Sequence, residues 1–156
     1  EDFQTCNRVI FGGNPEHTAL CVEMMHKAFP DKRYEETDWR TAEMVKYFIN
    51  TFLACKVSFA NEFKQICDSV NTDYDKVRDL ALLDERIGNS HLKVPGPDGI
   101  LGFGGTCFPK DLNCLIFFAN ENGITPSVLE CAWEKNLEVR EKQDWLSMFG
   151  RAVSHK

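Results

Sequence analysis

The sequence is organised around residues 102–111, GFGGTCFPKD, which an apolar run follows over residues 112–119. Glycine lets a backbone approach a ligand closely and adopt a positive φ, and Pro109 suits the first turn of a helix. We therefore expect Cys107 to lie just before a helix N-terminus. The N–H groups and the dipole of such a helix favour a negatively charged sulfur atom at that place.

The two residues at the end of this motif act on the thiol in opposite directions. Lys110 places a positive charge near Cys107, which favours the thiolate form. Asp111 opposes that form by charge repulsion, but its carboxylate can hold a water molecule near the sulfur. From the residues alone, two interpretations stay open: a nucleophile with its water-holding partner, or a glycine loop that caps a helix beside one more small core cysteine.

Composition excludes several classes of protein. The 156 residues suit one ordinary domain or part of a larger protein, and with 43% hydrophobic residues and 12 Phe they can form a substantial core. The net charge is −6, and no Lys/Arg cluster is interleaved with aromatic residues, so we expect no nucleic-acid partner. The apolar runs are too short to span a membrane, and no charged-then-apolar leader opens the chain. We expect a soluble, cytoplasmic protein.

The cysteines and histidines suggest neither a disulfide framework nor a metal site. The seven cysteines form an odd set without a CxxC pair, which favours reduced thiols in a core, and Cys107 alone has glycines, a proline and a Lys-Asp pair around it. The four histidines show no metal-ligand spacing, and we predict no metal.

The first 37 residues show the strand–helix–strand order of an α/β unit. Residues 8–13 predict a buried strand stopped by two glycines, and Asn14 with Pro15 predicts the cap and first residue of a helix that Pro30 ends. Residues 33–37 predict a second edge strand. One such unit cannot cover both faces of a parallel sheet, so this segment resembles the tail of a larger sheet domain.

From Trp39 onward the pattern is helical, which makes the fold class mainly α. Apolar residues at three- and four-residue spacing predict helices over residues 41–70, 72–83, 110–122 and 126–149, with Thr72 as an N-cap and Gly123 and Gly150 as ends. The first of these helices would be about 45 Å long. Residues 91–101 contain PGPDG and predict a loop.

Two blocks of the sequence resemble the UDP-glucose dehydrogenase family. GFGGTCFPKD with the preceding RIGNSHLKVPGPDG is similar to the family's active-site segment, and AEMVKYFINTFLACKVSFANE is similar to its central helix. The two matches occur in the right order and belong to a resemblance that covers most of residues 8–149. It implies that residues 1–38 are the incomplete C-terminal end of an NAD-binding, Rossmann-like α/β domain. Residues 39–150 would then be a helical central and dimerisation domain with the catalytic cysteine, and residues 151–156 a tail.

The resemblance also implies a reaction. Family members oxidise the primary alcohol of a nucleotide sugar to a carboxylate in two steps, each passing a hydride to NAD, through a cysteine thiohemiacetal and thioester. By resemblance Cys107 is the nucleophile, Lys46 and Asn50 stabilise the substrate oxygen, and Asp111 holds the hydrolytic water. The pathway implied is UDP-glucuronate and polysaccharide biosynthesis.

Further residues are assigned to binding by the same resemblance. Lys46 and Asn50 would also contact the sugar, and Arg86 would reach a nucleotide sugar bound in a neighbouring subunit. Lys93 and the backbone of Phe103 and Gly104 would lie along the nucleotide and sugar. Lys110 and the Cys107 backbone would line the cofactor side.

The sequence also departs from the family pattern. It contains no GxGxxG, and the family's active-site Thr and Glu, and the lysine of its C-terminal domain, have no counterpart in these 156 residues. We therefore expect a fragment that is inactive alone. Separately, we expect it to form a homodimer through its helices. Two alternatives stay open: a fragment of a GDP-mannose or UDP-N-acetylhexosamine dehydrogenase, and a helical dimerisation module without chemistry.

Overall fold

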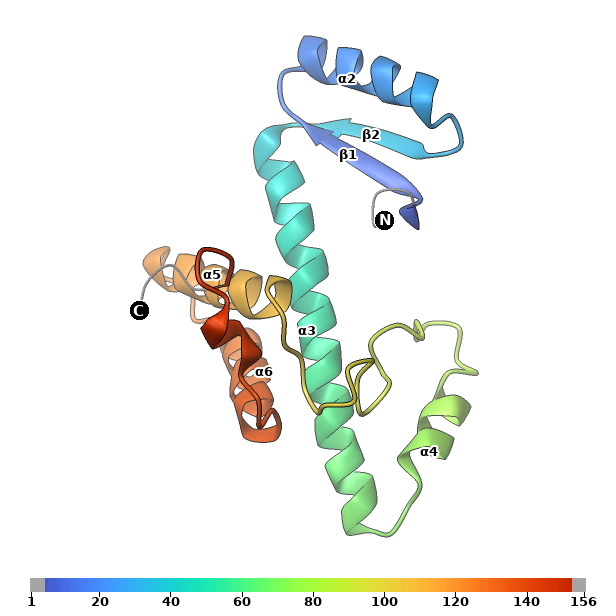
Figure 1. Cartoon of the computed structure of the whole chain (residues 1–156), viewed down its shortest axis with the longest axis vertical. Helices are drawn as coiled ribbons and strands as arrows, with labels where there is room; N and C mark the ends of the chain where they lie inside the picture. Colours follow the sequence, from blue (N-terminus) through green and yellow to red (C-terminus); the bar gives the residue numbers. More distant parts are fainter. Residues whose placement is uncertain (1–4, 153–156) are drawn as a thin grey trace. The chain divides into compact units, whose positions relative to one another are not determined.

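The chain is mainly helical and begins with a strand–helix–strand segment, as the sequence predicts (Figure 1). The computed structural model describes residues 5–152. It forms two compact units, Glu1–Phe48 and Ile49–Lys156, and the division falls within the long helix α3 (Trp39–Ser69). The predicted domain limits, 1–38 and 39–150, stay a prediction, and the predicted tail extends beyond the described residues.

The first unit is a short α/β segment. Its elements are β1 (Arg8–Gly12), α2 (Pro15–Ala28) and β2 (Arg33–Thr37). The two strands pair in parallel, with Arg8 opposite Arg33 and Gly12 opposite Thr37. Asn14 caps α2 by accepting a hydrogen bond from the Glu16 N–H at 2.9 Å, which confirms the predicted cap.

A tyrosine holds α2 beside the sheet. The Tyr34 hydroxyl of β2 lies 3.0 Å from the Met25 carbonyl oxygen and 2.9 Å from that of Phe29, at the end of α2. The buried Thr18 hydroxyl donates to a Glu36 carboxylate oxygen at 2.5 Å. These contacts join helix to strand within the first unit.

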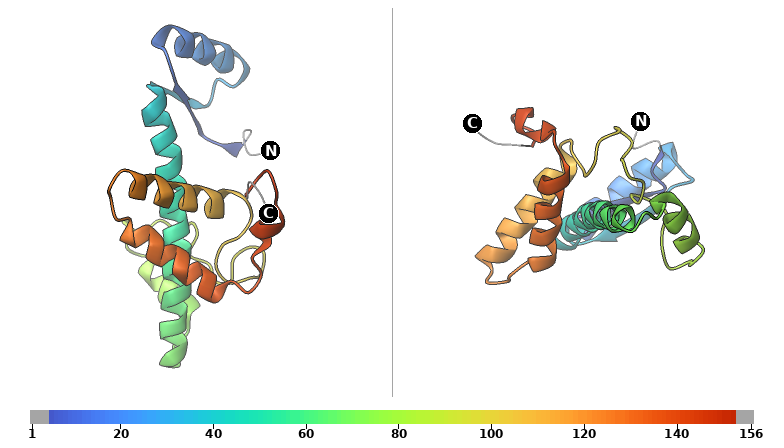
Figure 2. Two further views of the ribbon diagram at one scale, coloured as in Figure 1. Left: turned by 90° about the vertical axis from the view of Figure 1, so that its left-hand side faces the viewer. Right: turned by 90° about the horizontal axis from the view of Figure 1, so that it is seen from below.

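The second unit contains the C-terminal part of α3 and four further elements. They are α4 (Tyr74–Ala81), α5 (Cys107–Glu121), α6 (Ser127–Val139) and the 3₁₀ helix η1 (Asp144–Ser147). Seen along α3 in Figure 2, α5 and α6 lie on one side of this helix and α4 lies on the other. This arrangement gives the unit two separate apolar clusters.

The first cluster forms where α3, α5 and α6 meet. Ala54 of α3, Leu112 of α5 and Phe103 of the preceding loop are buried together, and Trp133 of α6 packs against them. The second cluster joins α3 to α4 and the following loop through Ala60, Cys67, Tyr74, Leu92 and Val94. Burial of these side chains fixes the loop that runs between α4 and α5.

The long loop over residues 82–106 contains neither helix nor strand, in agreement with the loop predicted for residues 91–101. Its first half is tied to the helices by two hydrogen bonds to its carbonyl oxygens. Lys56 of α3 donates to Gly88 at 2.7 Å, and the Tyr74 hydroxyl of α4 donates to Leu92 at 2.7 Å.

Several predicted helix limits are wrong. The helix predicted over 126–149 ends at Val139, because five polar residues separate Val139 from Trp145 and leave no apolar face to continue it. The predicted N-cap Thr72 is replaced by Asp73, whose carboxylate accepts hydrogen bonds from Asp75 N and Lys76 N. This helix, α4, ends at Ala81.

Candidate functional site

Cys107 is the first residue of α5 and is exposed to solvent. Its sulfur lies 3.7 Å from the hydroxyl oxygen of Thr106, the residue at the N-cap position. Pro109 follows within the first turn, as its fixed φ favours. The prediction placed Cys107 just before the helix, so the structure moves it one position inward.

Asp111 lies one helical turn after Cys107, and its side chain is only 1% exposed. One carboxylate oxygen accepts a hydrogen bond from the side-chain amide of Asn50, on α3, at 2.5 Å. The other accepts from the ammonium group of Lys110. The pKa of Lys110 is raised, mainly by its hydrogen bond to Asp111 and also by Cys107. Three residues predicted for the site, Asn50, Lys110 and Asp111, therefore lie together next to Cys107.

Side chains from three elements hold the glycine loop, residues 102–105, which lies shortly before Cys107. The Gly102 N–H donates to the side-chain oxygen of Asn61, on α3, at 3.1 Å. Asn136 of α6 is fully buried and makes two bonds to Phe103, accepting from its N–H at 2.7 Å and donating to its carbonyl oxygen at 3.1 Å. The backbone N–H and C=O groups of this loop are hydrogen-bonded to side chains, whereas those of a β-strand are hydrogen-bonded to the backbone of adjacent strands.

Asp144 of η1 holds the last glycine of the loop. One of its carboxylate oxygens accepts from the Gly105 N–H at 2.9 Å, and the other lies 3.1 Å from Nη2 of Arg140. Burial alone would raise the pKa of Asp144, but the bonds from Gly105 and Arg140 outweigh it and lower this pKa below its usual value.

Arg140 is a buried cation, with a side chain only 2% exposed. Its Nη1 lies 2.8 Å from a carboxylate oxygen of Asp98, and its Nε donates to the carbonyl oxygen of Lys142 at 3.1 Å. A Cβ at Gly104 would lie 2.2 Å from Nη2 of Arg140, so a side chain at this position would require the guanidinium to shift. Burial would raise the pKa of Asp98, but the hydrogen bond from the Ile100 N–H and the pairing with Arg140 lower it below its usual value.

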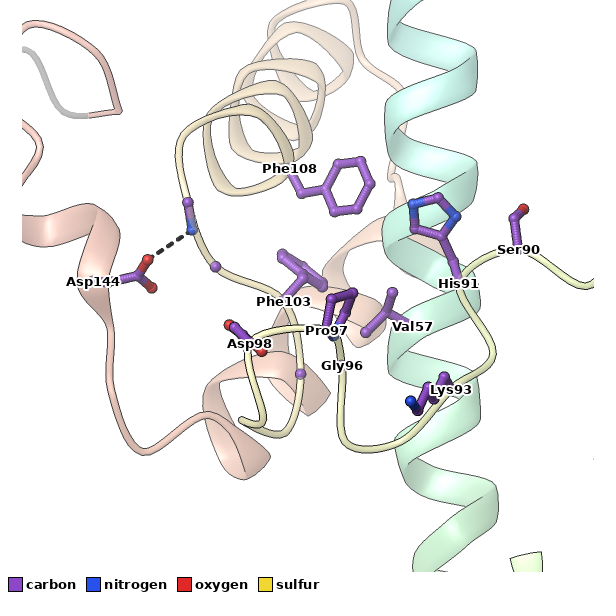
Figure 3. Close-up of a pocket in the computed structure, with 13 residues that line it drawn as sticks. Val57, Ser90, His91, Lys93, Gly96, Pro97, Asp98, Phe103, Phe108 and Asp144 are labelled. Carbon is purple, nitrogen blue, oxygen red and sulfur yellow. Dashed lines mark hydrogen bonds between the residues drawn. The ribbon is translucent and has the colours of Figure 1, made fainter. Parts of the chain in front are cut away.

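A pocket of about 570 Å³ lies between this loop, the loop over residues 90–98 and α3 (Figure 3). Its lining is aromatic in the middle, where the ring of Phe108 is 5.8 Å from that of Phe103 and 5.6 Å from that of His91. Lys93, Asp98 and Asp144 supply charged groups along the same lining. Figure 3 shows the Asp144 side chain turned towards the glycine loop. An aromatic hollow with a few polar groups suits a ligand that combines a ring with polar substituents.

His91 contributes a neutral ring to this pocket. Burial lowers its pKa, and the ammonium group of Lys56 lowers it further. The imidazole is therefore uncharged at neutral pH and supplies one donor and one acceptor.

The remaining predicted residues are placed as follows. Lys93, Phe103 and Gly104 line the pocket. Arg86 does not line it: its side chain is 88% exposed and pairs with the Asp84 carboxylate, with Nη2 at 2.6 Å. Lys46 lies in the first unit, where its ammonium is 5.7 Å from the ring centroid of Tyr47. The functional role of every one of these residues stays a prediction.

Sequence analysis missed the residues that hold the loop. They are Asn61, Asn136, Arg140 and Asp144, with His91 of the pocket wall. For the two asparagines a signal was present, because Asn61 follows Val57, and Asn136 follows Ala132, at the four-residue spacing of buried helical positions. Polar residues at such positions require internal partners.

Within residues 5–152, no group of three or more His, Cys, Asp or Glu side chains is arranged to hold a metal ion. Over the same range, no helix has both the length and the apolar character needed to cross a membrane.

Comparisons with known proteins agree on one family. Residues 40–138 match the model of the UDP-glucose/GDP-mannose dehydrogenase family, central domain. The UDP-glucose 6-dehydrogenase TuaD of Bacillus subtilis is 37% identical over 139 residues, which are 89% of this chain and 29% of the relative. The UDP-glucose 6-dehydrogenase of Rickettsia bellii is 35% identical over 140 residues, 88% of this chain and 31% of the relative. The chain thus spans under a third of the length of these relatives.

Solved structures give the same result. A UDP-glucose dehydrogenase from the hyperthermophilic archaeon Pyrobaculum islandicum superposes with a TM-score of 0.78 and 34% identity, over 88% of this chain and 30% of that one. The UDP-N-acetyl-mannosamine dehydrogenase Cap5O from S. aureus superposes with a TM-score of 0.61 and 28% identity, over 85% of this chain and 29% of that one. The chain therefore belongs to the UDP-glucose/GDP-mannose dehydrogenase family and carries its central domain over residues 40–138.

Proposed function

We propose that this chain is the cysteine-bearing part of a dehydrogenase that oxidises UDP-glucose to UDP-glucuronate with NAD. The observation that carries the proposal is the arrangement at the start of α5. An exposed Cys107 begins the helix, and one turn later Asp111 is buried and held by Asn50 and Lys110. The relatives named as UDP-glucose dehydrogenases support this choice of substrate.

In the proposed reaction the sulfur of Cys107 adds to the aldehyde carbon that the first oxidation produces. The C–S bond forms, and the carbonyl oxygen of the aldehyde becomes the oxygen of a thiohemiacetal. We assign Lys46 and Asn50 to that oxygen. Of the two N–H groups of the Asn50 amide, one donates to Asp111 and the other is proposed for the substrate.

The second oxidation converts the thiohemiacetal to a thioester, which water hydrolyses. Water adds to the thioester carbon, the C–S bond breaks, and the carboxylate leaves while the sulfur returns as a thiolate. Asp111 is proposed to hold this water, because a carboxylate accepts hydrogen bonds and this one lies one helical turn after Cys107. A fixed carboxylate is suited to this task, because its direction does not change between steps.

The residues described here do not form a cradle for the pyrophosphate of NAD. In the first unit the turn between β1 and α2 is Gly12-Gly13-Asn14; there Asn14 already accepts from the Glu16 N–H, and Pro15 has no N–H to offer. NAD would accept the two hydrides. We propose that it is held mainly by parts of the protein outside these 156 residues, with Lys110 and the Cys107 backbone on its side. The chain alone is then inactive.

The pocket is the proposed place of the nucleotide sugar. Lys93 supplies a positive charge for a phosphate, and the backbone of Phe103 and Gly104 lies along the lining. Arg86 is proposed to act on a substrate in a neighbouring subunit. The homodimer that this requires is proposed to form through exposed apolar residues of the second unit, such as Phe52 and Phe59 on α3.

A second substrate class has a specific observation in its favour. The Cap5O structure superposes over 85% of the chain, and its protein is named for an N-acetylated UDP-sugar. We place it second, because both the TM-score and the identity are lower than for the Pyrobaculum enzyme. GDP-mannose and a dimerisation module without chemistry are the remaining alternatives.

The proposal is tested by alkylating the purified chain with iodoacetamide and mapping each thiol by mass spectrometry. Cys107 should react faster than Cys131, which is also exposed and lies in the interior of α6. Millimolar UDP-glucose should slow the reaction of Cys107 only, and more than UDP-N-acetylmannosamine or GDP-mannose does. No NADH should form when UDP-glucose and NAD are added to the chain.

Equal rates at Cys107 and Cys131, with no protection by any nucleotide sugar, would reject the enzymatic account. The dimerisation module would then remain. Stronger protection by another nucleotide sugar would change the substrate but keep the chemistry.

A further inference from the structure

The segment between α6 and η1 contains Arg140, which connects the two loops that line the pocket, residues 96–101 and the glycine loop. Arg140 lies in the middle of this connection, 2.8 Å from the Asp98 carboxylate on one side and 3.1 Å from that of Asp144 on the other. Asp98 belongs to the loop over residues 96–101, and Asp144 accepts from the N–H of Gly105. A continuous set of contacts therefore runs from Asp98 through Arg140 and Asp144 to Gly105, two residues before Cys107.

The geometry of this connection differs from that of a surface ion pair. The Arg140 side chain is 2% exposed; its Nε and Nη2 donate hydrogen bonds to the carbonyl oxygen of Lys142 and to Asp144, while its Nη1 forms an ion pair with Asp98 at 2.8 Å but lacks the geometry of a hydrogen bond. A planar guanidinium held at three points cannot rotate towards one partner without leaving another. Gly104 lies against it: a Cβ there would come within 2.2 Å of Nη2 of Arg140, so the loop backbone and the guanidinium are closely packed.

The loop over residues 96–101, on the Asp98 side of Arg140, has fewer contacts with the rest of the unit than the glycine loop has. Asp98 is 47% exposed, and residues 96–100 otherwise close on themselves, through Gly96 N to Ile100 O at 3.2 Å and Ile100 N to the Asp98 carboxylate at 3.1 Å. The Arg140 contact is thus a link between a self-contained turn and the glycine loop. Residues of this turn and of the glycine loop line the pocket, so a ligand that fills the pocket would contact the turn and the loop.

We infer that Arg140 is a positioning residue: it transmits the position of the 96–101 loop to Gly105, and so sets the place of Cys107 at the start of α5. This inference rests on the proposed function in taking Cys107 as the reacting group. Movement of the pocket wall on a ligand is then coupled to the reactivity of the thiol. No contact between Arg140 and the ligand is needed, because the coupling runs through two carboxylates.

The test uses Asp98, the exposed end of the connection, because its replacement leaves the buried side chains in place. Asp98→Asn removes the charge that pairs with Arg140. Asp98→Glu keeps a carboxylate that can reach Arg140 but disturbs the hydrogen bond from the Ile100 N–H within the turn, which is 3.1 Å long. Asp68→Asn is the control, because Asp68 is an exposed partner of Lys64 on α3, at 2.7 Å, away from the pocket lining. Arg140→Lys is a second variant, which keeps the charge but not the two-sided contact.

Three measurements are made on each variant of the full chain: thermal unfolding, hydrogen–deuterium exchange of the peptide over residues 102–106, and the alkylation rate of Cys107 relative to Cys131. Asp98→Asn and Arg140→Lys should speed exchange over 102–106. They should also lower the relative rate of Cys107 by about two- to fivefold, the size of a helix-terminus contribution. Asp98→Glu should restore both values, and Asp68→Asn should change neither.

A merely local role for Asp98 predicts a different pattern. Exchange would then rise over residues 96–101 only, Asp98→Glu would behave like Asp98→Asn, and Cys107 would keep its rate; this result would overturn the inference. It is also distinct from failure of the proposed function, because the exchange measurement needs no substrate. Equal alkylation of Cys107 and Cys131 in the parent chain, with no protection by any nucleotide sugar, rejects the function; faster exchange over residues 102–106 in Asp98→Asn would still support the coupling between the loops.

Discussion

Replacement of Asn136 tests whether side chains hold the glycine loop. This residue is fully buried, and its amide makes two bonds to the backbone of Phe103, at 2.7 and 3.1 Å. Asn136→Ala leaves one N–H and one C=O of Phe103 without these partners inside the core. Each such buried group costs about 1–3 kcal/mol, so we expect a loss of about 2–6 kcal/mol in the free energy of unfolding. Asn136→Leu should cost about as much, because it restores the volume but not the hydrogen bonds.

The assay is urea unfolding followed by tryptophan fluorescence. Trp133 and Trp145 report on this region, since their ring centroids lie 5.3 Å apart and that of Trp133 lies 6.1 Å from that of Phe103. Trp39 lies in the first unit and is replaced by Phe in all variants, so that one transition is recorded. Asn120→Ala is the control, because Asn120 is exposed on α5.

Two outcomes would refute this reasoning. If Asn136→Ala costs no more than Asn120→Ala, the bonds to Phe103 do not hold the loop. If Asn136→Leu is as stable as the parent chain while Asn136→Ala is not, volume and not hydrogen bonding stabilises the site.

Two further predictions concern the same connection. Gly104→Ala should lower the free energy of unfolding by about 1–3 kcal/mol, because its Cβ would lie 2.2 Å from both Arg140 Nη2 and an Asp144 oxygen, whereas Gly88→Ala, with no atom within 4 Å, should change it by no more than about 0.5 kcal/mol. Urea unfolding measures both, and equal costs would show that Gly104 is not confined by the guanidinium. The pKa of Asp144 and that of Asp98 are both lowered in the folded chain, so their contribution to stability is present above the usual carboxyl pKa of about 4 and is lost as the pH falls through the lowered values. The decline of stability in acid should be shallower for Asp144→Asn than for the parent chain, and parallel curves would contradict this assignment.

Local patterns in the sequence were sufficient to predict the elements of the fold. Both strands, the cap at Asn14 and the long helix were predicted, because alternation, capping residues and three- to four-residue spacing are properties of neighbouring residues. The last helix was predicted ten residues too long, to Phe149 and not Val139. Trp145 and Leu146 kept an approximate helical spacing, but they lie in η1, where Trp145 is buried against Trp133. Spacing cannot distinguish a continued helix from a chain that turns back onto the core.

The site was predicted only as far as the motif extends. Cys107, Lys110 and Asp111 are neighbours in sequence, and Asn50 was assigned by resemblance. The residues that hold the loop were not predicted, because Asn136 is 33 positions from Phe103, and Asp144 is 39 from Gly105. Arg140, read from sequence, is one charged residue inside the helix predicted over residues 126–149. Its burial between two carboxylates arises only when the loops meet.

This distribution determines what the GFGGTCFPKD motif can do by itself. Glycines give residues 102–105 the freedom to approach a ligand, and the same freedom would let the loop take many conformations. Asn61, Asn136 and Asp144 remove that freedom by bonding three of the four N–H groups in this loop. A chain with the motif but without these three side chains would present its cysteine on an unfixed loop, so the reactivity of the thiol belongs to the packed unit and not to the motif.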